Sequence, residues 1–131
     1  MSNNNRIESD MRRAKGLGSA HEGLHHWMAQ RITALANIPL TLWAVYSIFT
    51  LQGASYAEFT AYFALPWNTV LGVLFVLATF YHAVLGSQVI VEDYIHSKWL
   101  KMTKLISQKL FFIALGAATI IAILKLAFTA G

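Results

Sequence analysis

The chain has 131 residues, of which 56% are hydrophobic and only 12% are charged. Soluble domains carry about 25% charged residues, so this composition excludes an ordinary soluble domain and indicates a single membrane-embedded domain. The absence of cysteine excludes disulfides, thiolate metal sites and cysteine nucleophiles. The net charge of +4 does not indicate nucleic-acid binding, because the positive residues flank hydrophobic segments, where they set topology and contact anionic lipid.

Residues 1–26 form a polar N-terminal segment with both basic and acidic side chains. A signal peptide needs an apolar core directly behind its basic residues, whereas the first apolar run here begins near Trp27. We therefore expect this segment to be retained. Its acidic residues also disfavour an organellar transit peptide and point to a bacterial protein.

The first predicted membrane span covers residues of about 28–51. Arg31 lies at its entrance and is followed by an uncharged run of 20 residues. Pro39 within this run removes one backbone donor and frees the carbonyl of Leu35, which a packed membrane bundle can satisfy in other ways. We expect a helix with a kink near Pro39.

The next segment, residues 52–66, contains no lysine or arginine and ends at a proline. We predict a short loop lying at the membrane interface. Tyr56, Tyr62 and Trp67 are expected to form its aromatic belt.

The second predicted span, residues 67–91, has 25 residues without a formal charge and is followed by Glu92, Asp93 and Tyr94. Helical residues rise about 1.5 Å each, so this span reaches about 37 Å and can cross a hydrocarbon core of about 30 Å. His82 therefore lies deep in the bilayer. An ionisable ring at that depth is costly unless it faces protein, water or a metal, so His82 is a candidate functional residue.

The third predicted span covers residues of about 110–129, and residues 95–109 before it are expected to form a loop. That loop contains four lysines, and one further lysine, Lys125, lies near the end of the span, where its long side chain can reach the surface. Gly116, Ala117 and Ala118 give the span a small-residue patch suited to close helix contact.

The distribution of lysine and arginine predicts the orientation of the chain. Four precede the first span (five with Arg31), none lies between the first and second spans, four lie between the second and third, and one lies near the end. Positive loops stay on the cytoplasmic side, so we expect the N-terminus inside and the C-terminus outside. Arg31 and the group Glu92, Asp93 and Tyr94 then lie at the same inner surface.

The residues alone leave two interpretations of His82. It is either a neutral ring that hydrogen-bonds a neighbouring helix, or a metal ligand whose second ring nitrogen donates a hydrogen bond. Gly86, one turn further on, would let a flat macrocycle approach the helix; with Ala83 and Ser87 it could equally form a packing face. One histidine cannot supply both axial ligands of a haem, so a second ligand would have to come from another chain or be absent.

The polar rim of the second span also has two interpretations. Eleven residues separate His82 from Asp93, close to three full turns, so both lie on one helix face about 16 Å apart, with Tyr94 one step round. A redox centre above a protonatable rim would suit a small molecule that takes up electrons and protons. Alternatively, the rim residues only mark the interface, and Arg31 only extends to lipid headgroups. The sequence contains no catalytic triad, phosphate loop or zinc motif.

At these residues the chain resembles the small hydrophobic membrane anchor subunits of succinate dehydrogenase, respiratory complex II. The resemblance rests on His82, Ala83, Gly86, Gln88, Val89, Asp93 and Tyr94 with their spacing, and on Gly23, His25, Arg31, Thr33 and Ala34. It covers the chain from about residue 17, and the run HHWMAQRITALANIPL is most similar to alphaproteobacterial proteins.

The resemblance implies an all-α membrane protein whose three transmembrane helices are part of a bundle completed by a partner anchor subunit. The polarity of the sequence divides the chain into a polar inner segment, residues 1–26, and a three-span anchor, residues 27–131. By the same resemblance the chain is a non-catalytic subunit of succinate:ubiquinone oxidoreductase in the bacterial inner membrane, serving the tricarboxylic acid cycle and the respiratory chain. Its partners would be a larger cytochrome b anchor subunit, an iron-sulfur subunit and a flavoprotein.

The site residues follow from the resemblance. His82 would be an axial ligand of haem b, and the other ligand would be a histidine of the larger anchor subunit. Tyr94 would hydrogen-bond a carbonyl of ubiquinone, with Asp93 beside it holding the site or delivering protons. Arg31 matches a basic position near the haem propionates. The alternatives are the anchor of a quinol:fumarate reductase, a structural subunit of another membrane complex or, less favoured, a transporter.

Overall fold

The computed structural model describes residues 19–129, which form three long helices and one short one. They are α2 (Ser19–Thr50), α3 (Tyr56–Ala64), α4 (Pro66–Tyr94) and α5 (Lys98–Thr129). No strand occurs within these residues, which confirms the predicted all-α class. Residues 1–18 of the predicted polar segment lie outside the described residues. The long helices are each long and apolar enough to cross a membrane, as the sequence predicted.

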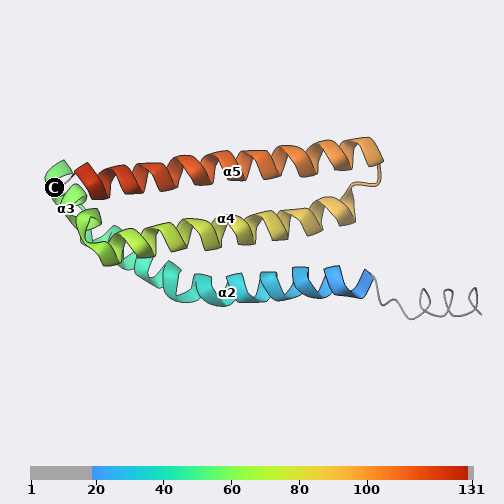
Figure 1. Cartoon of the computed structure of the whole chain (residues 1–131), viewed down its shortest axis with the longest axis horizontal. Helices are drawn as coiled ribbons and strands as arrows, with labels where there is room; N and C mark the ends of the chain where they lie inside the picture. The colour runs from blue at the N-terminus through green and yellow to red at the C-terminus, as the bar shows by residue number, and fades with distance from the viewer. Residues whose placement is uncertain (1–18, 130–131) are drawn as a thin grey trace, which may run out of the picture.

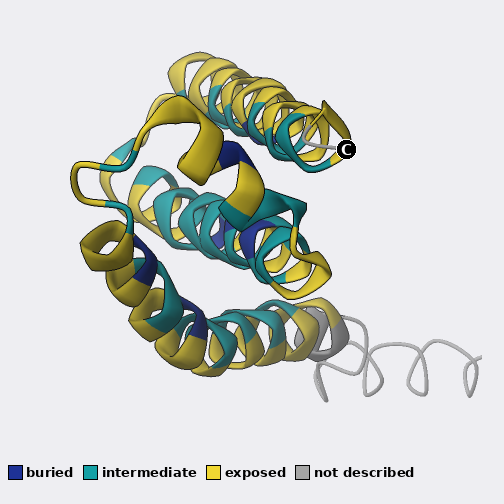
Figure 2. Cartoon of the chain, turned by 90° about the vertical axis from the view of Figure 1, so that its left-hand side faces the viewer, coloured by how far each residue is buried: buried dark blue, intermediate teal, exposed yellow. Residues whose placement is uncertain are grey.

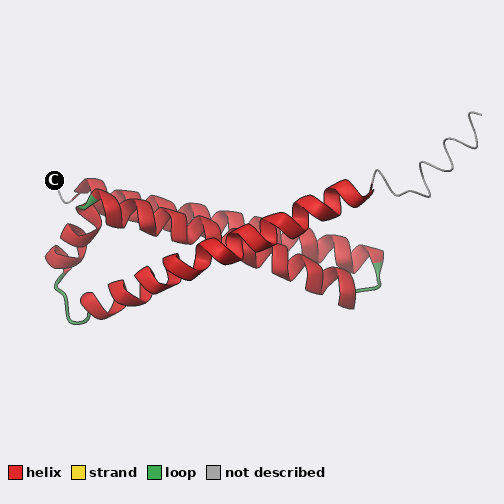
Figure 3. Cartoon of the chain, turned by 90° about the horizontal axis from the view of Figure 1, so that it is seen from below, coloured by secondary structure: helices red, strands yellow, loops and turns green. Residues whose placement is uncertain are grey.

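Helix α4 is the central helix of the bundle. It packs against α2 on one side and α5 on the other, while α2 and α5 do not contact each other within the described chain (Figure 1). Viewed from below, α2 crosses the α4–α5 pair at an angle (Figure 3). Each residue of α4 therefore faces α2, faces α5, or points away from the chain, and this decides which α4 residues could meet a cofactor.

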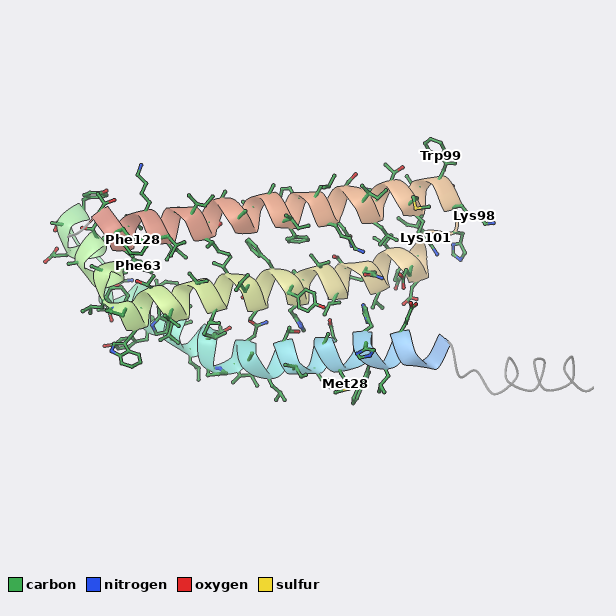
Figure 4. The ribbon with its side chains drawn as sticks, viewed as in Figure 1. Met28, Phe63, Lys98, Trp99, Lys101 and Phe128 are labelled. Atoms are coloured by element: carbon green, nitrogen blue, oxygen red, sulfur yellow. The ribbon has the colours of Figure 1, made fainter. Side chains whose placement is uncertain are left out.

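The two ends of the bundle differ in charge. We call one end the basic end: there α2 begins, α4 ends, and α5 begins with Lys98 and Lys101 (Figure 4). At the other end, which we call the α3 end, the short helix packs on α4 and α5. Glu92, Asp93 and Tyr94 lie at the basic end, as the topology prediction requires. Arg31 lies further into the bundle than predicted, because Gln30 beside it lies against Gly86 and Thr33 contacts His82, about 12–18 Å along α4 from Tyr94.

Few side chains are buried in the chain alone (Figure 2). Leu40, Val76 and Leu85 are the buried hydrophobic residues, and many large apolar side chains on all three long helices are exposed. In water this surface would be unstable, but a membrane helix exposes apolar side chains to lipid or to other helices. The low burial is the pattern expected of a subunit that is completed by lipid and partners.

Close packing between α4 and α5 depends on one glycine. Gly116 is buried, and a Cβ atom built on it would lie 2.9 Å from Cδ2 of Phe80. This confirms close contact at the predicted small-residue patch. Gly116 is the buried member of this patch, whereas Ala117 and Ala118 are exposed.

The loop predicted for residues 52–66 was wrong in part, because this segment contains helix α3. Ser55 caps the helix by accepting a hydrogen bond from the Glu58 backbone N–H, and the Glu58 carboxylate accepts one from the Ser55 backbone N–H at 2.7 Å. The hydrogen bond from the Ser55 backbone N–H, together with one from the Ser55 hydroxyl at 2.8 Å, stabilises the ionised carboxylate and lowers the pKa of Glu58. The spacing of serine and glutamate is that of a capping box, a helix-start signal that the sequence interpretation missed.

The aromatic belt predicted for this segment also needs correction. Tyr56 and Trp67 are strongly exposed, which suits an interfacial position. The hydroxyl of Tyr62 instead lies 2.7 Å from the hydroxyl of the buried Ser47. Tyr62 therefore joins α3 to α2 through its hydroxyl.

The loop predicted for residues 95–109 was also wrong over most of its length. Only residues 95–97 are non-helical, and the four lysines belong to α5, which starts at Lys98. The sequence around them has no glycine or proline, so nothing in it stops a helix. Lys101 also donates a hydrogen bond to the backbone oxygen of Glu92 at 3.1 Å, which satisfies a carbonyl at the end of α4.

The helix predicted around Pro39 continues through that proline.

Candidate functional site

His82 lies in the contact between α2 and α4, which we call the α2–α4 seam. Its side chain is partly buried, and its Nδ1 lies 3.1 Å from Oγ1 of Thr33 on α2. Its Nε2 has no hydrogen-bond partner among residues 19–129. One ring nitrogen is therefore held by the chain while the other remains available.

The residues on either side of His82 make the seam polar. Asn37 of α2 donates a hydrogen bond to the Ala78 backbone oxygen at 3.4 Å and accepts one from the Thr79 hydroxyl at 3.2 Å. One turn beyond His82, the face of Gly86 is covered by Gln30, whose Nε2 would lie 3.6 Å from an added Cβ. The two hydrogen bonds of Asn37 therefore pair polar groups of α2 and α4 across the seam, whereas Oε1 of Gln30 is buried without a partner among the described residues.

The contact at Gly86 bears on the two interpretations of that glycine. A macrocycle lying on Gly86 from the α2 side would meet the Gln30 side chain. Within this chain the glycine therefore allows close packing of α2, the alternative that the sequence left open. Any flat group beside His82 would have to approach from a side of α4 that α2 does not cover.

Asp93 and Tyr94 lie at the basic end of α4, apart from His82. Both side chains are exposed, Tyr94 to 79%, and neither forms a hydrogen bond with another described residue. Glu92 differs from them, because its carboxylate accepts a hydrogen bond from Gln88 at 2.9 Å. The free polar groups at this rim are therefore those of Asp93 and Tyr94, the pair that the resemblance singled out.

Arg31 is not brought to His82 by this fold. Its guanidinium lies 5.5 Å from the centre of the Trp27 ring, and the side chain is exposed. Residues two apart on a helix differ by about 200° in direction, so Arg31 and Thr33 point to nearly opposite sides of α2. Because Thr33 faces His82, Arg31 faces away from the α2–α4 seam.

The sequence interpretation missed the α2 residues of the seam. Gln30, Thr33 and Asn37 are spaced three and four residues apart, which places them on one helix face. A polar stripe of this kind inside an apolar span indicates a contact with another helix, because each polar side chain in a membrane needs a partner. Its partner could not be read from the sequence, because the pairing with α4 depends on how the helices cross.

The described residues fit one ligand position of a haem iron and no more. They include no group of three or more histidine, cysteine, aspartate or glutamate side chains that could hold a metal ion. An imidazole with one nitrogen hydrogen-bonded and the other unpaired is the usual form of a histidine ligand. The remaining ligands would have to come from the macrocycle and from another chain.

Comparison with known proteins agrees with this architecture. The model of a family described as "Succinate dehydrogenase/Fumarate reductase transmembrane subunit" matches residues 3–124. The succinate dehydrogenase hydrophobic membrane anchor subunit of Rickettsia bellii is 36% identical over 117 residues, which cover 89% of this chain and 94% of that protein.

Two further relatives have the same description. The anchor subunit of Rickettsia typhi is 34% identical, with the same 89% and 94% coverage. That of Paracoccus denitrificans is 35% identical over 81 residues, 62% of this chain and 63% of that protein. With nearly its whole length matched by the family model, the chain belongs to the transmembrane subunits of succinate dehydrogenase and fumarate reductase.

Proposed function

We propose that this chain is a membrane anchor subunit of succinate dehydrogenase in which His82 is an axial ligand of haem b. The observation behind the haem proposal is the state of the His82 ring, with Nδ1 held by Thr33 and Nε2 unpaired. His82 is also at the right depth. Sixteen residues separate it from Pro66 and 12 from Tyr94, about 24 Å and 18 Å along α4, so it lies near the middle of the span.

The proposed haem is shared with a larger cytochrome b anchor subunit, which supplies the second axial histidine. Haem would supply a one-electron redox centre in the middle of the membrane. A partner has an apolar surface to cover. A groove of about 520 Å³ lies between α2 and α4, and its lining includes Ala78 and Tyr81, which precede His82 on α4 by four residues and one residue. Leu77 and Tyr81 of α4 remain about half exposed.

The quinone proposal rests on the basic end. Tyr94 would donate its hydroxyl proton in a hydrogen bond to a ubiquinone carbonyl, and Asp93 beside it would hold the site or deliver a proton. Both side chains are exposed and unpaired within the described chain, so both are free to meet a ligand or a partner. Lysines at the start of α5 make this end the proposed cytoplasmic surface of a bacterial inner membrane.

The proposed partners on that surface are the iron-sulfur subunit and the flavoprotein, which would oxidise succinate and pass electrons to the quinone in the tricarboxylic acid cycle and respiratory chain. The chain itself would contribute no catalytic residue to succinate oxidation. The relatives named above are all described as anchors of succinate dehydrogenase, which favours this activity over quinol:fumarate reduction within the shared family. Arg31 would lie near the haem propionates, as the resemblance implies; because it points to the side of α2 opposite Thr33, the propionates would have to reach that side.

Purification of the tagged chain from its native membrane tests the proposal. We expect a flavoprotein, an iron-sulfur protein and a second hydrophobic subunit to copurify, with a b-type band in the reduced-minus-oxidised spectrum and succinate:quinone reductase activity. Copurification with a different membrane complex would contradict the anchor assignment. Copurification with the expected subunits but without a b-type band would contradict the haem assignment alone.

A further inference from the structure

The hydroxyl of Thr33 lies between two backbone carbonyls and the His82 ring. Its Oγ1 donates to the Ala29 backbone oxygen at 2.8 Å, with the Gln30 backbone oxygen at 3.1 Å, and lies 3.1 Å from His82 Nδ1. A threonine hydroxyl has one proton to donate and two lone pairs that accept. These contacts decide which way the hydrogen bond to His82 runs.

The single proton of Thr33 is directed to the carbonyls of its own helix. Two carbonyl oxygens compete for it on that side, and hydrogen-bonding to the carbonyl four residues back is the ordinary arrangement of a helical threonine. The lone pairs of Oγ1 are then left to face the imidazole. Nδ1 must be the donor in the contact with His82, so Nδ1 has the ring proton.

The opposite tautomer is less favourable in this seam. If Thr33 donated to Nδ1, the ring proton would sit on Nε2, where residues 19–129 provide no acceptor. An N–H donor left without a partner away from water is destabilising. With the proton on Nδ1, the donor is paired and Nε2 offers a lone pair.

We propose that Thr33 is a positioning residue that fixes His82 in the Nδ1-protonated tautomer and so reserves Nε2 for the haem iron. The inference rests on the proposed haem function of His82. A hydrogen bond from Nδ1–H also makes the imidazole a more basic ligand, which stabilises ferric over ferrous iron. Thr33 therefore lowers the midpoint potential of the haem as well as orienting its ligand.

Replacement of Thr33 in the intact complex tests this. Thr33→Val keeps the shape of the side chain but removes the hydroxyl that accepts the hydrogen bond. Thr33→Ala removes the same hydroxyl with a smaller side chain and serves if valine disturbs assembly. Thr33→Ser keeps the hydroxyl. The matched control is Thr79→Val, which removes a hydroxyl from the same seam that bonds Asn37 and not His82. The readouts are the haem midpoint potential and the rate at which haem is lost to a haem-scavenging protein.

We expect Thr33→Val and Thr33→Ala to raise the midpoint potential. A tenfold change in the redox equilibrium corresponds to about 59 mV for one electron. Haem affinity should fall by about 10–100-fold, the usual effect of removing a hydrogen-bond partner of a metal ligand. Thr33→Ser and Thr79→Val should match the wild type in both measurements.

Two results would overturn the inference. Unchanged potential and haem retention in both Thr33→Val and Thr33→Ala would show that the hydroxyl does not act on the ligand. Equal shifts in Thr33→Val and Thr79→Val would show a general loosening of the seam. A His82→Ala complex separates these results from failure of the haem proposal. If His82→Ala loses haem but the Thr33 substitutions have no effect, only the positioning role of Thr33 is refuted. If the spectrum of His82→Ala is unchanged, the assignment of His82 as the haem ligand is refuted.

Discussion

His82 and Tyr94 are held by the chain in different ways, and this decides what their substitution measures. His82 is tied across the seam to Thr33, whereas the Tyr94 side chain is 79% exposed and its hydroxyl bonds to no described residue. Replacement of Tyr94 therefore removes no contact that the described fold uses. Its effect reports on what Tyr94 binds outside the chain.

Tyr94→Phe should lower quinone reductase activity by about tenfold while sparing haem and assembly. The substitution deletes one hydroxyl, and a hydrogen bond of up to about 1.5 kcal/mol corresponds to about one decade in rate. Succinate oxidation with an artificial acceptor that takes electrons from the soluble subunits should be unchanged. The measured quantity is the ratio of the two activities in one preparation.

Tyr56→Phe is the matched control for this substitution, because Tyr56 lies at the α3 end of the bundle, away from both proposed sites, and its side chain is 75% exposed. It should leave the ratio unchanged. Equal loss of both activities in Tyr94→Phe would indicate failed assembly, and loss of neither would leave Tyr94 as an interfacial residue only.

At the scale of the elements, Gly116 sets the distance between α4 and α5. Gly116→Ala should be less stable than Gly72→Ala by about 1–3 kcal/mol, the usual cost of overpacking. Both variants gain the same helix propensity, but the new Cβ at Gly116 lies 2.9 Å from Phe80, whereas at Gly72 its nearest neighbours are at an ordinary 3.5 Å. Detergent denaturation followed by circular dichroism measures the difference, and equal stabilities would contradict the close contact.

The helices themselves could be predicted from the sequence, and their exact lengths and pairing could not. Long uncharged runs dictate membrane helices because backbone groups in lipid must be satisfied within the segment. Helix α3 was missed because the capping box of Ser55 and Glu58 was not considered beside the charge pattern and the terminal proline of its segment. The start of α5 was missed because the lysines were taken to mark a loop. His82 stood out as an ionisable residue in a span, but Thr33 could be matched to it only once α2 was placed on α4.

At the scale of the whole molecule, the positive residues predict the orientation. A single cysteine at Ser97, between α4 and α5, should be labelled only from the cytoplasmic side, and one at Gln52, between α2 and α3, only from the outside. The chain has no native cysteine to interfere. Labelling of the Ser97→Cys variant by a membrane-impermeant maleimide in intact cells would reverse the orientation and move the proposed quinone site to the outer surface.

The most direct test of the account is the spectrum of the His82→Ala complex. Alanine is well tolerated in a membrane helix and removes a costly polar group, so the spans should still insert. We expect the other subunits to copurify and the b-type band of the reduced-minus-oxidised spectrum to be lost or altered. An assembled His82→Ala complex with the wild-type spectrum and midpoint potential would contradict the claim that His82 binds the haem iron.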